Sequence, residues 1–105
     1  MMGYQVEQGK AKNYQDVEFY LNRMRAFKHA RISATLEVYT DTGKAYYSVY
    51  SYNTLIATMV WDMIKNESIE KMLDNNWYSV TTGKHQGYIA RAFGIIQDIR
   101  CTILV

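Results

Sequence analysis

The chain has very few of the residues from which catalytic and metal sites are usually built. Its 105 residues include one cysteine and two histidines, whereas a metal site, or a nucleophile with its base, needs several such groups held together. The single thiol, that of Cys101, excludes a disulfide within the chain, which favours a reducing compartment. We therefore expect a cytoplasmic protein that is not an enzyme and that uses no cofactor and no metal.

Proline and long apolar runs are also missing. No stretch approaches the roughly 20 apolar residues that cross a bilayer, and residues 1–9 lack the basic start and apolar centre of a signal peptide. The net charge of +2 is too small for a strongly basic nucleic-acid scaffold. With 49% hydrophobic residues the chain can bury one core, so we expect a single domain over residues 1–105, with residues 1–12 as a flexible lead-in.

The first half of the chain has clear periodic patterns. Apolar residues at spacings of three and four predict a helix over Tyr14–Phe27, with Asn13 as its N-cap. Strict alternation predicts a strand over Arg31–Tyr39, and a turn at Thr40–Gly43 leads into the tyrosine-rich run Lys44–Tyr52. These two strands are expected to form a hairpin, with Ala45, Tyr47 and Val49 on its core side.

The second half is less regular. A further strand is expected from about Thr54 to Trp61, after a break or bulge at Ser51–Asn53. The segment Asp62–Asn76 fits a short helix or a return strand, and the helix is favoured slightly. The segment Trp77–Val80 is expected to be extended. A helix capped by Thr81 or Thr82 is then predicted to run to about Phe93 and to stop at Gly94. A last strand is expected within Ile95–Val105, with Cys101 on its inner side. The sum is an α+β fold, an antiparallel sheet of about four to five strands with two or three helices packed on one face.

Four tyrosines form the most distinctive surface feature. Alternation places Tyr39, Tyr46, Tyr50 and Tyr52 on the face opposite the aliphatic core. Another layer covers these rings, or they are exposed and either stack nucleobases or form the centre of a protein interface. Since neither motif of the common RNA-recognition domain is present, we favour protein contact over RNA.

The positive residues offer a second surface. The densest group is Arg23, Arg25, Lys28, His29 and Arg31, and Lys84 lies further along the chain. These side chains could contact phosphates or an acidic partner. Basic side chains in the last half of a helix also complement the helix dipole, so the cluster is equally expected in a protein that binds no ligand there. A small nucleic-acid-binding regulator that uses this cluster is therefore the alternative function.

The segment Thr81-Thr82-Gly83-Lys84 has hydroxyls, a glycine and a lysine at the start of a predicted helix. Such a segment could bind an anion, but it lacks the glycine spacing of nucleotide-binding loops, and helix capping is the simpler interpretation. His85 follows directly, with no second histidine or carboxylate at a ligand spacing. A structural role is expected for it, and an enzyme built around His85 and Thr82 is the least favoured hypothesis.

Two short motifs resemble a known family. Ser51–Ala57 reads SYNTLIA and Tyr78–His85 reads YSVTTGKH, and together they resemble a family of small uncharacterised bacteriophage proteins with SYNT…A and YSxTTxKH motifs. The resemblance covers about half of the chain, Ser51–Gly94, with a longer connection between the motifs than is usual in the family. It implies a phage protein in the host cytoplasm that binds a host protein, such as an inhibitor of a defence system like a CRISPR nuclease. Whether the chain also forms a homodimer stays open.

Overall fold

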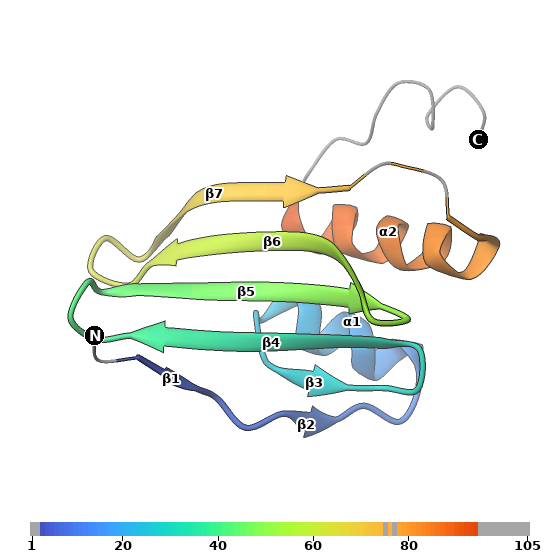
Figure 1. Ribbon diagram of the computed structural model, residues 1–105, viewed down its shortest axis with the longest axis horizontal. Helices are drawn as coiled ribbons and strands as arrows, with labels where there is room; N and C mark the ends of the chain where they lie inside the picture. Colours follow the sequence, from blue (N-terminus) through green and yellow to red (C-terminus); the bar gives the residue numbers. More distant parts are fainter. Residues whose placement is uncertain (1–2, 75, 77, 95–105) are drawn as a thin grey trace.

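The computed structural model describes residues 3–74, 76 and 78–94, and it is an α+β fold (Figure 1). Within this part of the chain, seven strands form one sheet and two helices pack together. The elements in chain order are β1 (Gly3–Gln5), β2 (Gly9–Lys10), α1 (Tyr14–Asn22), β3 (Phe27–Lys28), β4 (Ile32–Tyr39), β5 (Lys44–Ser51), β6 (Thr54–Asp62), β7 (Glu67–Leu73) and α2 (Val80–Phe93).

The sheet is mostly antiparallel. Its strand order is β2-β3-β4-β5-β6-β7, with β1 pairing β4 beyond the end of β3, and only the β2–β3 pair is parallel. The long strands β4, β5, β6 and β7 lie side by side in Figure 1. The sheet is wider than expected for three reasons: residues of the expected lead-in form β1 and β2, Phe27–Lys28 form β3, and β7 returns beside β6.

Two tight hairpins join the central strands. Gly43 has a φ of 70° and ends the β4–β5 turn, as expected from the sequence. The β5–β6 turn consists of Tyr52 and Asn53, both with positive φ, which matches the twist that hairpins favour. The irregularity expected at Ser51–Asn53 is therefore a regular turn, and the register shift lies further along β6, where Ile56 is an extra residue between Leu55 and Ala57.

The helix favoured for Asp62–Asn76 is wrong, and the return strand is correct. Asp62 accepts hydrogen bonds from the backbone N–H groups of Ile64 and Lys65, and Asn66 has a φ of 56°. This turn sends Glu67–Leu73 back along β6 as an edge strand. Ile69 and Met72, whose spacing favoured a helix, are both exposed in β7, so no buried helical face is formed.

The first helix is shorter than expected. Asn13 caps it by accepting a hydrogen bond from the N–H of Asp16, as predicted. The helix ends at Asn22 rather than at Phe27, because Met24 adopts a φ of 52° that helical residues do not take. Phe27 belongs to β3, where its side chain is fully buried.

The second helix has a different N-cap from the expected one. Ser79, and not Thr81 or Thr82, is the N-cap, and its hydroxyl accepts a hydrogen bond from the N–H of Thr82. Val80, expected to be extended, is the first helical residue. Gly94 ends the helix with a φ of 66°, as predicted. The strand expected within Ile95–Val105, including Cys101, lies outside the described residues.

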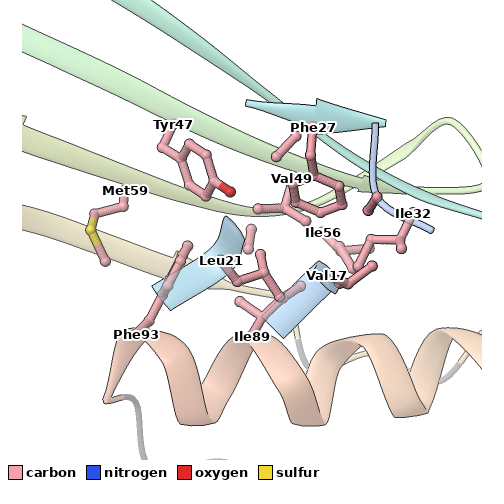
Figure 2. Close-up of a cluster of buried hydrophobic side chains, with 13 residues drawn as sticks. Val17, Leu21, Phe27, Ile32, Tyr47, Val49, Ile56, Met59, Ile89 and Phe93 are labelled. Carbon is pink, nitrogen blue, oxygen red and sulfur yellow. The ribbon is translucent and has the colours of Figure 1, made fainter. Parts of the chain in front are cut away.

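The core lies between one face of the sheet and the two helices (Figure 2). Val17 and Leu21 of α1 and Ile89 and Phe93 of α2 meet strand residues that alternate along the sheet. The strand residues include Ala34 of β4, Tyr47 and Val49 of β5, and Ala57 and Met59 of β6. We call this side the inner face and the opposite side the open face.

One buried hydroxyl gives a direct test of this packing. Tyr47 is fully buried, burial raises the pKa of its phenol, and its hydroxyl donates a 2.8 Å hydrogen bond to the carbonyl oxygen of Arg25. Tyr47→Phe is expected to lower the free energy of unfolding by about 1–2 kcal/mol, because the carbonyl loses its partner. Urea unfolding measures this loss. Tyr46→Phe is the control, because Tyr46 is exposed on the same strand, and it should lower the free energy of unfolding by under ~0.5 kcal/mol. Equal losses in the two variants would contradict the buried hydrogen bond of Tyr47.

Candidate functional site

The open face of the sheet carries three of the four tyrosines expected there. Residues on β4 and β5 alternate as predicted, so that Tyr39, Tyr46 and Tyr50 lie opposite the core. The two helices of the described chain cover the other face, where Val17 and Leu21 of α1 and Ile89 and Phe93 of α2 join the core. The prediction that tyrosines gather on a face away from the core is confirmed for these three.

Two of these rings form a fixed pair. The rings of Tyr39 and Tyr46 meet edge to face, 5.4 Å apart at an angle of 86°. The Tyr39 hydroxyl donates a 2.9 Å hydrogen bond to Glu37, which raises the pKa of Tyr39, and its ring packs over Gly3 of β1. Tyr46 remains 39% exposed. A shallow hollow of about 530 Å³ lies beside the pair, lined in part by Thr42 and Ser48.

Tyr52 does not belong to this group. Alternation ends at Ser51, and the positive φ of Tyr52 turns the chain away from the open face. The Tyr52 ring lies 6.4 Å from the ring of His85 in α2 instead, and it is 53% exposed. Its expected place beside Tyr46 and Tyr50 was wrong, because the sequence does not show where a strand stops and a turn begins.

The open face carries more negative than positive charge. Four carboxylates and three lysines lie on it by register. The carboxylates are those of Glu37, Asp62, Glu67 and Glu70, and the lysines are Lys10, Lys28 and Lys44. Glu37 and Glu70 share a cross-strand row with Tyr46, so a polyanion is repelled there and a basic surface is attracted.

The residues of the expected basic cluster separate in the fold. Arg23 and Arg25 lie over the ring of Phe19, at 3.9 and 6.0 Å from its centroid, in the second half of α1. Arg31 and Lys84 lie near His85, and His85 contacts Tyr14 at the start of α1. The length of α1, about 13 Å, separates Tyr14 from Arg23. Lys28 points to the open face beside Ser33. The structure thus places Arg31 and Lys84 each near His85, whereas Arg23 and Arg25 lie at the other end of α1 and Lys28 lies on the open face.

A buried polar cluster joins the two sequence motifs. Ser51 of the first motif lies 2.7 Å from Nδ1 of His85 and 2.9 Å from the hydroxyl of Thr82, both in the second motif. On its other side, Nε2 of His85 lies 3.3 Å from the hydroxyl of Tyr14 in α1. Ser51 is 1% exposed and His85 is 0% exposed. Sequence reasoning found His85 and Thr82 but not Ser51 or Tyr14, and the only signal for Ser51 was its place in the other motif.

Both ring nitrogens of His85 lie within hydrogen-bonding distance of a hydroxyl, Nδ1 of Ser51 and Nε2 of Tyr14. In one consistent arrangement Ser79 donates to Thr82, Thr82 to Ser51 and Ser51 to Nδ1, while the proton on Nε2 is donated to Tyr14. Because a hydroxyl can both donate and accept, the neutral imidazole needs no charged partner here. Burial, together with electrostatic interaction with His29, Arg31 and Lys84, lowers the pKa of His85 to about 4, which favours the neutral form.

The cluster has the chemistry of a structural network. No carboxylate of the described residues contacts His85, so nothing there stabilises an imidazolium. Both Ser51 and His85 are closed off from solvent, so a substrate cannot reach them without a change in the fold. The expected structural role of His85 agrees with this geometry, and the cluster holds α2 against the end of β5.

The remaining observations concern metals, membranes and relatives. Across the described ranges, no three His, Cys, Asp or Glu side chains are placed to hold a metal ion. Neither of the helices in the described chain is long and apolar enough to cross a bilayer. Comparison with protein-family models, with curated proteins and with solved structures finds no match.

Proposed function

We propose that this chain is a non-enzymatic protein-binding domain and that the open face of its sheet is the contact surface. One observation carries the proposal: the Tyr39–Tyr46 pair and Tyr50 lie on a face to which no described helix contributes. Tyrosine rings are enriched at the centres of protein interfaces, since each adds contact area and a hydroxyl at small entropic cost. The hollow beside Tyr46 gives a partner side chain a place to insert.

The charge of the open face favours a protein over a nucleic acid. Bases could stack on Tyr46 and Tyr50, but the phosphates beside Tyr46 would meet Glu37 and Glu70. A protein can present lysine or arginine to these carboxylates and apolar atoms to the rings. The separated basic residues also weaken the alternative function, because a phosphate backbone would contact them only in small groups.

The source of the partner follows from the motif resemblance. The pair of motifs Ser51–Ala57 and Tyr78–His85 is similar to that of small phage proteins, so we look for the partner among the proteins of a bacterial host. Inhibition of a host defence nuclease is the specific form of this proposal. The buried contact of Ser51 with Thr82 and His85 gives both motifs a reason within the fold, and it leaves the open face for the partner.

The test is capture of a host protein followed by measurement of its affinity. Wild-type protein and a Tyr46→Ala, Tyr50→Ala variant, each shown to be folded by circular dichroism, are used to capture proteins from nuclease-treated bacterial lysate. The captured protein is then purified and titrated. The variant is expected to bind at least about tenfold more weakly, because truncating central tyrosines costs at least ~1.4 kcal/mol.

Tyr4→Ala is the matched control. Tyr4 is exposed and lies on β1, and its register partner is the inner-face residue Val38. The control should therefore bind like the wild type. A partner lost equally in both variants, or capture of nucleic acid alone in the absence of nuclease, would count against the open face, and the second outcome would favour the basic residues.

A further inference from the structure

A groove lies on the inner face, beyond the area that the helices cover. It has a volume of about 450 Å³ and lies where the C-terminal ends of α1 and α2 approach β4, β6 and β7. Its surface is largely apolar, with Leu36, Trp61 and Phe93 among its lining residues. Pockets of this size and character are typical of small-molecule sites.

Three methionines make the lining adaptable. Met24 follows α1, Met59 belongs to β6, and Met63 begins the β6–β7 turn. Unbranched thioether side chains repack around ligands of different shape at little cost. The fourth methionine of the described residues, Met72, lies on the open face and does not line the groove.

The charged groups of the groove are all positive. Arg23 and Lys71 line it and are exposed, and no carboxylate lines it. Lys71 donates to the carbonyl oxygen of Phe93 at 2.8 Å, and Arg23 lies over the ring of Phe19, so both cations are held in place. Neither forms an ion pair with another residue of the described chain, in which Arg91 pairs with Glu18. Their remaining N–H donors can bind an anionic group of a ligand whose body lies on the apolar lining.

We propose that this groove binds a small amphiphilic anion, with an apolar body against Trp61 and the methionines and an acidic group between Arg23 and Lys71. The charge complementarity selects this ligand class over a neutral apolar molecule. The groove and the open face lie on opposite sides of the sheet, so the proposal is independent of the protein-binding function.

The test uses two fluorescent probes of similar shape. The anionic probe is 8-anilinonaphthalene-1-sulfonate, and the neutral one is N-phenyl-1-naphthylamine. Folded protein is expected to bind the anionic probe more tightly. Arg23→Gln together with Lys71→Gln should weaken binding of the anion about tenfold, since loss of charge-assisted contacts has this size, and should leave the neutral probe unaffected. Lys84→Gln removes a positive charge at the other end of α2 and should change neither affinity.

Methionine methyl resonances locate the probe. With ¹³C-labelled methionine, the anionic probe is expected to shift the signals of Met24, Met59 and Met63 and to leave Met72 unchanged. Equal affinity for the two probes, or unchanged binding in the double variant, would overturn the proposal. Failure to bind either probe, with the three methionine signals shifting as protein concentration rises, would identify a second copy of the chain as the occupant and overturn it as well.

Discussion

Acidification from pH 7 to pH 4 is expected to lower the free energy of unfolding by about 3 kcal/mol through His85 alone. The side chain is fully buried, and burial, with the nearby charges of His29, Arg31 and Lys84, lowers its pKa to about 4. In the unfolded chain the same imidazole has a pKa of about 6.5. Protonation of Nδ1 in the folded protein would also require the Ser51 hydroxyl to accept this hydrogen bond rather than donate it.

The direction of the effect follows from proton binding. Above pH 6.5 the imidazole is neutral in both states, and it has no effect on the pH dependence. Between pH 6.5 and pH 4 only the unfolded chain binds the proton, so acid stabilises the unfolded state. Below pH 4 both states are protonated and the loss reaches its limit. The stability supplied by His85 is therefore present above its unfolded pKa and is lost as pH falls towards 4.

The measurement is urea unfolding at several pH values between 7 and 4. Carboxylates also titrate in this range, so the wild type is compared with His85→Gln, which keeps an amide in place of the imidazole and does not titrate. The wild type should lose about 3 kcal/mol more than the variant over this range. An NMR titration of the His85 ring gives its pKa directly. Parallel stability curves, or a ring pKa near 6.5, would contradict the buried neutral assignment.

The faces of β4 and β5 could be predicted because a strand has a period of two residues. Once the core side of one strand is known, every second residue follows, and Ala45, Tyr47 and Val49 were assigned correctly. The same reasoning failed at Tyr52, where positive φ ends the alternation. It failed again in β7, because a short run of apolar residues fits both the helical period and the strand period. Pairing with β6 makes this segment a strand.

The candidate site was only half predictable. Tyr39, Tyr46 and Tyr50 follow from local alternation, but the contact between Ser51 and His85 joins residues 34 positions apart. Such a contact depends on where α2 docks on the sheet, which no local pattern shows. The separation of Arg23 from Arg31 has the same origin, since the chain leaves α1 at Met24 and returns through β3 before Arg31.

Phe27→Ala is expected to lower the free energy of unfolding by about 3–5 kcal/mol, the range for removing a buried aromatic ring. Phe27 is fully buried in the core, and its ring stacks on the ring of Tyr20 with centroids 5.6 Å apart. Since small domains are stable by only about 5–15 kcal/mol, this loss should be visible in thermal and urea unfolding. Phe19→Ala is the control, because that ring is 44% exposed. Equal losses in the two variants would contradict the burial of Phe27.

The position of Phe27 also predicts where the variant opens first. β3 holds β2 in the sheet, through hydrogen bonds from the N–H of Gly9 to Ala26 and from the N–H of Ala11 to Lys28. Without the ring, β3 loses its buried side chain, so hydrogen exchange at Gly9 and Ala11 should accelerate more than exchange in β5. Equal acceleration at both places would mean that the sheet opens as one unit, and that the ring stabilises the whole core rather than this edge.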